Sequence, residues 1–145
     1  MLSGPWTIAE VDEWLHQQRT PIRLACQRQD GFPAIVSLWF TLHQGALWCA
    51  TQSSAGVIKM LGRDGKCGFE IATNDMPYCG IRGSGQAHIH PHRGGETLDI
   101  LLERYHIDPQ SKLARWLASR RSSEVAIEIV PEKIQSWDYR ERMTG

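Results

Sequence analysis

The stretch RLACQRQDGFPAIVSLWF, residues 23–40, decides the fold of this 145-residue chain. Its first part alternates apolar and polar residues, as expected for a strand with one buried face. Asp30-Gly31 then supplies a turn that is typical of a β-hairpin. The run that follows, PAIVSLWFTL at residues 33–42, is apolar on both pleat faces, which predicts a strand covered on both sides. Because the connection is short, the two strands are expected to pair antiparallel.

The segments on either side of this hairpin predict a helix before it and a strand and a helix after it. Thr7-x-x-Glu10 is a capping box, and the apolar residues that follow at helical spacing predict a helix that ends before Pro21. ALWCAT, residues 46–51, is expected to form a third strand. QSSAGVIKMLGR, residues 52–63, has the apolar spacing of a short helix, which the serines are expected to cap.

The second half of the chain adds strands and two further helices. KCGFEIA (66–72), YCGIRGSGQAHIH (78–90) and EVAIEIV (124–130) have the patterns of strands, and the ending PEKIQSWDYRERM supplies at most one more. The interior glycines of the second strand mark a bend or a close approach to the backbone. One helix is expected over 96–107, and Asp108-Pro109 should start another. This order predicts a small barrel of α+β character in one domain, residues 1–145.

The composition excludes several classes of protein. The formal net charge is zero, which argues against a nucleic-acid binder. No apolar run reaches the ~18 residues of a membrane span, and the N-terminus does not resemble a signal peptide, so a cytoplasmic protein is expected. The four cysteines form no C-x-x-C pair and are expected to be buried free thiols. Six tryptophans are many for this length, so some should line a pocket or an interface.

Three of the six histidines, His88, His90 and His92, stand close together in QAHIHPHRGG, residues 86–95. On a strand, His88 and His90 share one face, and Pro91 breaks the alternation before His92. A zinc site needs three or four protein ligands, and only two of these imidazoles have a defined geometry. The cluster therefore predicts a solvated strand end and no metal site, with metal binding and catalysis as the alternatives.

Five pieces of the chain, in their order and spacing, resemble the pyridoxamine 5′-phosphate oxidase-like flavin-binding split-barrel family. They are RLACQRQDGFPAIVSLWF, GALWCATQSS, LGRDGKCGFEI, YCGIRGSGQAHI and the ending IVPEKIQSWDYRERM. The resemblance implies a mainly β (α+β) fold, a six-stranded antiparallel split β-barrel with flanking helices. It also implies a homodimer with two FMN molecules at its interface, each touched by both subunits.

The same resemblance implies where FMN would bind. The flavin ring would lie along the strand that contains Ile35, Val36, Ser37 and Leu38, with Trp39 either in the core or in the wall of the pocket. The phosphate would lie at the strand-to-helix junction, near Thr51, Ser53, Ser54 and Lys59. Trp137, in the tail that matches the family's last strand, would pack in the dimer or contact the cofactor.

The junction itself has groups that suit a phosphate, although it also departs from the family's pattern. TQSSAGVIK, residues 51–59, offers hydroxyls, a helix start and a lysine. The alternative is that the serines only cap the helix and that Lys59 is solvated. Many family members have cations at the positions that match Ala55, Gly56 and Val57, and all three are uncharged here. Either Lys59, Arg23 or Arg82 compensates, or FMN binding is weak or absent.

These observations favour an FMN-binding, oxidoreductase-like protein that passes hydride between the flavin and an unidentified small molecule. No Ser/His/Asp set and no pair of carboxylates can be placed around one pocket, so hydrolase chemistry is not indicated. The first alternative is a non-enzymatic protein of the same fold that stores or senses a flavin, a deazaflavin or haem. The second is a metal-binding protein that uses the histidine cluster. The expected partners are a second copy of the chain and a small molecule, with no nucleic acid and no membrane.

Overall fold

The computed structural model describes residues 1–143, and its strands form a single sheet. The strands are β1 (Leu2–Ser3), β2 (Ile22–Gln27), β3 (Pro33–Leu38), β4 (Thr41–His43), β5 (Ala46–Gln52), β6 (Lys66–Ala72), β7 (Cys79–His90) and β8 (Glu124–Asp138). The helices are α1 (Ile8–Gln17), α2 (Gly56–Arg63), α3 (Gly94–Arg104), α4 (Lys112–Ser119) and α5 (Arg140–Met143), with a 3-10 turn at Arg121–Ser123.

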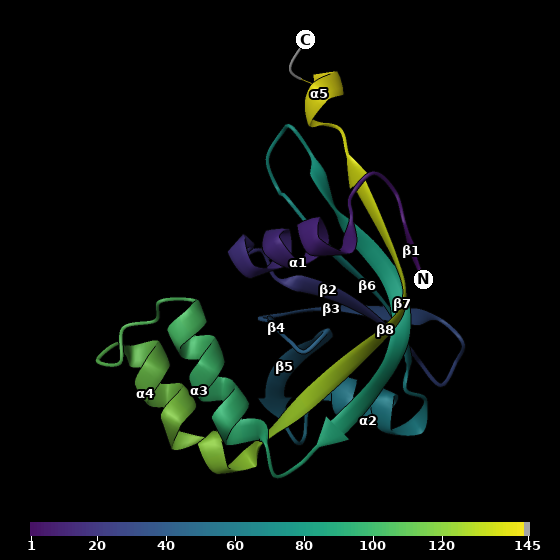
Figure 1. Cartoon of the computed structure of the whole chain (residues 1–145). Coiled ribbons are helices and arrows are strands. Elements are labelled where there is room, and N and C mark those ends of the chain that lie inside the picture. Colours follow the sequence, from purple (N-terminus) through teal and green to yellow (C-terminus); the bar gives the residue numbers. More distant parts are fainter. Residues whose placement is uncertain (144–145) are drawn as a thin grey trace.

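The strands of the sheet have the order β3-β2-β6-β7-β8-β5-β4. The two edge strands follow each other directly in the sequence. They are β3 and β4, and only Trp39 and Phe40 separate them. The sheet therefore curls into a barrel, with helices outside it (Figure 1). This confirms the mainly β, α+β fold class. The predicted number of six strands is not confirmed, because the sheet has eight strands, of which β1 has two residues and β4 three.

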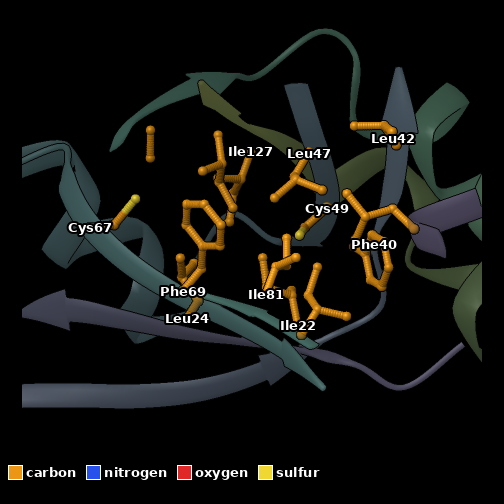
Figure 2. Packing of buried hydrophobic residues seen from close by; sticks show 14 of the residues in the cluster. Ile22, Leu24, Phe40, Leu42, Leu47, Cys49, Cys67, Phe69, Ile81 and Ile127 are labelled. Carbon is orange, nitrogen blue, oxygen red and sulfur yellow. The ribbon is translucent and has the colours of Figure 1, made fainter. Parts of the chain in front are cut away.

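Apolar side chains from almost every strand fill the interior of the barrel. Figure 2 shows this packing, with Phe40 and Leu42 near β4, Cys49 from β5, and Phe69 and Ile81 from β6 and β7. All four cysteines are buried and free, as predicted. Burial raises the pKa of the Cys67 thiol to about 11, so this group behaves as a small apolar side chain rather than as a nucleophile.

The run PAIVSLWFTL differs from the prediction of one strand covered on both sides. It breaks at Trp39 and Phe40, where the chain passes from β3 to β4. Within the chain, only one face of β3 is covered, because Ile35 is 71% exposed and Ser37 is also exposed. Among residues 1–143, β3 pairs with β2 alone, so its other edge carries no strand. The outer face of β3 and its free edge are therefore both open in the single chain.

The glycines of β7 mark close approaches, as the sequence predicts, and the approaching elements are β6 at Gly80 and β8 at Gly83 and Gly85. A Cβ on Gly83 would lie 2.1 Å from the carbonyl oxygen of Lys133, and one on Gly85 would lie 2.2 Å from that of Val130. The register shifts between Ser84 and Gly85, which is a β-bulge opposite Pro131. The bulge lets β8 continue past the proline as one strand of 15 residues.

Of the three predicted helix caps, two are wrong. The Thr7–Glu10 capping box of α1 is present as predicted. The cap of α2 is Ala55, which makes no side-chain hydrogen bond, so the serines do not cap this helix. α4 begins after Ser111, whose hydroxyl accepts from the Ala114 amide at 3.0 Å, whereas Asp108 accepts from Gln110 in the preceding turn. In residues 1–143, no helix is both long enough and apolar enough to cross a membrane.

Candidate functional site

A pocket of about 250 Å³ lies between β3, β5 and the helical pair α3 and α4. Its lining residues are mostly apolar: Pro21, Ser37, Leu38, Trp39, Ala50, Leu98, Leu101, Leu117 and Glu124. Side chains alternate between the two faces of a strand. Because Cys49 points into the barrel core, Ala50 and Gln52 point outward. The pocket is therefore on the outer face of β5, the face beside which α3 and α4 lie in Figure 1.

The wall of the pocket is held in place by contacts between the β3–β4 bend and the end of α3. The Trp39 ring stacks on the Tyr105 ring with centroids 5.1 Å apart. The Phe40 amide donates to the Tyr105 hydroxyl at 3.2 Å. Trp39 thus lies in the wall of the pocket, where it packs on Tyr105, and among residues 1–143 it is not part of the buried core cluster.

A buried carboxyl, Glu124, stands at one end of the pocket. Gln52, its neighbour across β5 and β8, donates through Nε2 to Glu124 Oε2 at 2.6 Å and to the Arg120 carbonyl at 3.1 Å. Burial raises the pKa of the Glu124 carboxyl, and the Gln52 hydrogen bond and the Arg120 charge partly offset this. Neither residue stands out in the sequence, where the one signal is a carboxyl directly before the apolar run of β8.

The residues predicted beneath the flavin ring divide between the two faces of β3. Ser37 and Leu38 line the pocket. Val36 is half-buried and packs against the core. Ile35 is exposed on the outer face, on the same side as Ser37. The structure therefore brings half of this set to the pocket and leaves Ile35 beside it, on the uncovered surface.

The residues predicted to hold the phosphate are spread more widely. Thr51 points to the face opposite Gln52, away from the pocket. Ser53 and Ser54 are exposed in the turn after β5, where the Ser53 amide donates to the Ser123 carbonyl at 2.8 Å. Ser123 directly precedes Glu124 in the sequence. The hydrogen bond from Ser53 to Ser123 therefore places this turn at the Glu124 end of the pocket. Lys59 is exposed on α2, which packs against β7 and β2.

The three uncharged positions after the turn have different surroundings. Val57 is part of the hydrophobic core, so a cation at this position would be buried in it. A Cβ on Gly56 would meet nothing within 4 Å, and the residue has no positive φ. The position therefore has room for a longer side chain.

Of the two arginines considered as substitute cations, Arg23 is the better placed. It stands directly opposite Ser37 in the β2–β3 pairing, so both side chains lie on one face. Among residues 1–143, no hydrogen bond or ion pair engages the Arg23 side chain. Arg82 instead donates to Gln135 at 3.1 Å and lines a different pocket, beside β1.

Trp137 lies at the far end of β8 from the pocket. Glu124 begins this strand and Trp137 is its penultimate residue, so at about 3.3 Å per residue they are separated by roughly 40 Å of strand. Figure 1 shows β8 running with β7 from the α3 side of the barrel toward α5. The Trp137 indole nitrogen is buried without a hydrogen-bond partner among the described residues. Within one chain, Trp137 is thus not part of the Glu124 pocket.

The histidine cluster is less solvated than the sequence predicts. His88 and His92 are exposed, but His90 is partly buried, with its Nε2 atom 2.9 Å from Glu128 Oε1 and its ring 5.1 Å from that of Trp48. In the described part of the chain, no three histidine, cysteine or acidic side chains are grouped so that they could hold a metal ion.

Solved structures with the same fold are numerous, although no family model and no curated protein matches the sequence. A conserved hypothetical protein from Mycobacterium tuberculosis is 24% identical with a TM-score of 0.77, over 97% of this chain and 89% of that one. An F420 reductase is 20% identical with a TM-score of 0.71, over 84% and 94%. A predicted pyridoxamine 5′-phosphate oxidase from Listeria innocua is 15% identical with a TM-score of 0.64, over 86% and 93%.

The same fold also occurs in a FAD-binding protein from Mesorhizobium loti and in a haem storage protein from Vibrio cholerae. The chain therefore has the split-barrel fold of the pyridoxamine 5′-phosphate oxidase-like proteins, as its sequence resemblance implies.

Proposed function

We propose that this split barrel binds a flavin, with FMN as the expected form, and passes hydride between the flavin and a small molecule. The observation that supports this most is the apolar pocket beside Ser37, Leu38 and Trp39, on the strand where the family resemblance expects the ring. Proteins of the same fold include an F420 reductase and a FAD-binding protein, which supports a flavin-type ligand.

The residues of the pocket fit a flat heteroaromatic ring. Leucines and Trp39 offer apolar contact, and Ser37 and Glu124 offer polar contact at its edges. β3 pairs on one side only, so its other edge presents backbone N–H groups to a ligand. A bound flavin would supply the redox chemistry, while the protein binds, orients and tunes it.

The turn and the nearby cations suit the phosphate of FMN. Ser53 and Ser54 lie at one end of the pocket, close to the start of α2. Arg23 lies on the same face of the sheet as Ser37 and is free to bind an anion. Arg23 and Lys59 are therefore the two candidates for the cation that the sequence lacks at residues 55–57.

We propose in addition that the site is completed by a second copy of the chain. The pocket volume, about 250 Å³, is below the roughly 300–1,000 Å³ of complete ligand sites. Ile35, two positions before Ser37 on β3, is 71% exposed, and Phe32 at the β2–β3 turn is equally exposed. Trp137 of a second copy is the expected cover, because the family resemblance places it either in the dimer interface or against the cofactor.

A protein of this fold that only binds its ligand is the second candidate function. A haem storage protein shares the fold, and a deazaflavin would occupy the same ring site as FMN. Haem would need an axial ligand, and the lining residues include no histidine, cysteine, methionine or tyrosine. The pocket therefore favours a flavin or a deazaflavin over haem.

The absorbance spectrum of the purified protein, with mass analysis of any bound ligand, tests the proposed function. A flavin gives a yellow protein, and haem gives a Soret band. If the protein is colourless and neither FMN, riboflavin nor a deazaflavin binds on addition, the proposal is wrong. If a flavin binds but no electron donor reduces it faster than free flavin, the non-enzymatic candidate is correct.

Replacing Gly56 with lysine should tighten FMN binding, because it adds a cation at the turn where space is open. One charge-assisted phosphate contact is worth about 1.5–3 kcal/mol, or roughly a 10- to 150-fold lower dissociation constant. If Arg23 holds the phosphate, Arg23→Ala should weaken FMN binding. If Lys59 holds it, Lys59→Ala should do so. Fluorescence quenching measures each affinity, and riboflavin, which has no phosphate, is the control. Equal shifts for both flavins would show that the phosphate lies elsewhere.

The protein should be a dimer in solution, and Ile35→Asp should shift it toward monomers. A charge on this exposed apolar residue would be buried without a partner in the proposed interface. Light scattering at micromolar concentration gives the mass of each form. Ile8→Asp, on the 60% exposed Ile8 of α1, is the matched control and should leave the mass unchanged. A monomeric native protein would refute the proposed interface.

A further inference from the structure

We propose that Glu124 binds the edge of the ring as a protonated carboxyl, so that ligand binding takes up a proton from solvent. This inference rests on the proposed function, and it defines the ligand more closely. The ligand should be a heteroaromatic ring with a hydrogen-bond acceptor, a carbonyl oxygen or a ring nitrogen, on the edge that faces Glu124.

The position of Glu124 is the first support. Among the residues that line the pocket, it is the only one with an ionisable side chain, and it is 5% exposed. Its backbone is fixed between two elements. Glu124 pairs with Gln52 on β5, and the start of α3 comes so close that a Cβ on Gly94 would lie 1.9 Å from the Glu124 carbonyl oxygen. The carboxyl therefore has little freedom to move away from a ligand.

The hydrogen bonds around the carboxyl leave one oxygen for the ligand. Gln52 uses both hydrogens of its amide group, one for the Arg120 carbonyl and one for Glu124 Oε2. Because both partners are acceptors, the amide nitrogen must be on this side. No residue of the described chain bonds to Oε1. This oxygen can receive a proton and donate it to an acceptor in the pocket.

The charges near Glu124 are too few to hold it ionised once a ring covers it. α3 presents Leu98 and Leu101 to the pocket, α4 presents Leu117, and β5 presents the neutral Gln52. Arg120 is the one cation that lowers the carboxyl pKa, and its guanidinium lies 4.5 Å from the centre of the Trp116 ring. Arg121 is paired with Asp99 of α3 at 2.8 Å.

Binding of a ring removes the remaining water from this carboxyl, which disfavours its charged form. The pKa of Glu124, already raised by burial, rises further in the complex. Affinity is then greatest below the pKa of the free protein and falls as the pH rises toward the pKa of the complex. Between these two pKa values, the decrease is about tenfold per pH unit for one proton.

Riboflavin is the probe, because the phosphate of FMN titrates on its own. Its dissociation constant, from fluorescence quenching across the pH range in which circular dichroism shows a folded protein, should rise with pH. In Glu124→Gln, the side-chain carbonyl oxygen can still accept from Gln52, and the NH2 group is a hydrogen-bond donor that is neutral at every pH. This variant should bind about as tightly as the native protein at low pH and should show no pH dependence. Glu128→Gln, the same change further along β8 and outside the pocket, should keep the native profile.

Calorimetry in two buffers with different ionisation enthalpies counts the protons without any variant. In the pH range where the affinity decreases, the native protein should take up close to one proton. If riboflavin binds with no pH dependence and no proton uptake, the role of Glu124 is refuted and the proposed function stands. Loss of riboflavin binding at every pH in a folded Glu124→Gln variant refutes it as well. If the native protein binds FMN but no riboflavin at any pH, the role of Glu124 at the ring is refuted and the proposed function stands. If it binds neither FMN, riboflavin nor a deazaflavin, both proposals are wrong.

Discussion

Replacing Phe40 with alanine should lower the free energy of unfolding by about 3–5 kcal/mol. Phe40 is fully buried at the bend where the chain passes from β3 to β4 and closes the barrel. The guanidinium of Arg104 lies 4.9 Å from the centre of its ring. Truncation would leave a cavity between the two edge strands of the sheet. It would also remove the contact between the Phe40 ring and the Arg104 guanidinium. Chemical denaturation followed by circular dichroism measures the loss.

Phe32→Ala is the matched control, because it makes the same truncation on a side chain that is 71% exposed. Within a monomer it should change the free energy of unfolding by no more than about 0.5 kcal/mol. Similar losses in both variants, measured where the protein is monomeric, would mean that the bend does not hold the barrel closed.

A second large loss is expected from Gly94→Ala, which should destabilise the fold by about 3 kcal/mol, the upper end of the range for overpacked sites. The added methyl group would overlap the carbonyl group of Glu124, whose oxygen would be 1.9 Å and carbon 2.1 Å away. Both partners are backbone, so α3 must move away from the start of β8 to relieve the overlap. Denaturation measures the loss, and riboflavin affinity should fall with it because Glu124 moves.

Gly62→Ala makes the same change in α2, where the new methyl group meets nothing within 4 Å. Alanine is the better helix former, so this variant should gain about 0.5–1 kcal/mol. A Gly94→Ala variant as stable as Gly62→Ala would show that α3 is not held tightly against β8.

The barrel could be predicted from the sequence because its strands have clear alternation and short turns. The capping box of α1 is a local contact and could be predicted. The glycines of β7 could be predicted to mark a close approach, although the approaching strands could not be identified from the sequence. The start of α4 could not be predicted, because Asp108-Pro109 and Ser111 are both good local signals and the helix begins after Ser111. The exposure of Ile35 could not be read from an apolar pattern, since the pattern does not say what covers a face.

The site was harder to predict than the fold, because its parts meet only through tertiary structure. The family resemblance predicts that Ser37 and Leu38 contact a flavin ring, and the structure places both in the wall of the candidate pocket. Glu124 and Gln52 come from strands 72 positions apart, and a carboxyl before an apolar run has no signature of its own. Thr51 was placed with its neighbours along the chain, but alternation turns it to the other face.

The central position of β8 in the sheet has a consequence for how the protein is made. β8 is the last long strand in the sequence, yet it pairs with both β7 and β5. Before residues 124–138 leave the ribosome, the sheet exists at most as two pieces, one with β3, β2, β6 and β7 and one with β5 and β4. Until β8 is added, β7 and β5 are each an unpaired edge strand. Unpaired edge strands are sites at which incompletely folded chains aggregate. Closure also joins segments far apart in sequence, so folding should take milliseconds to seconds rather than microseconds.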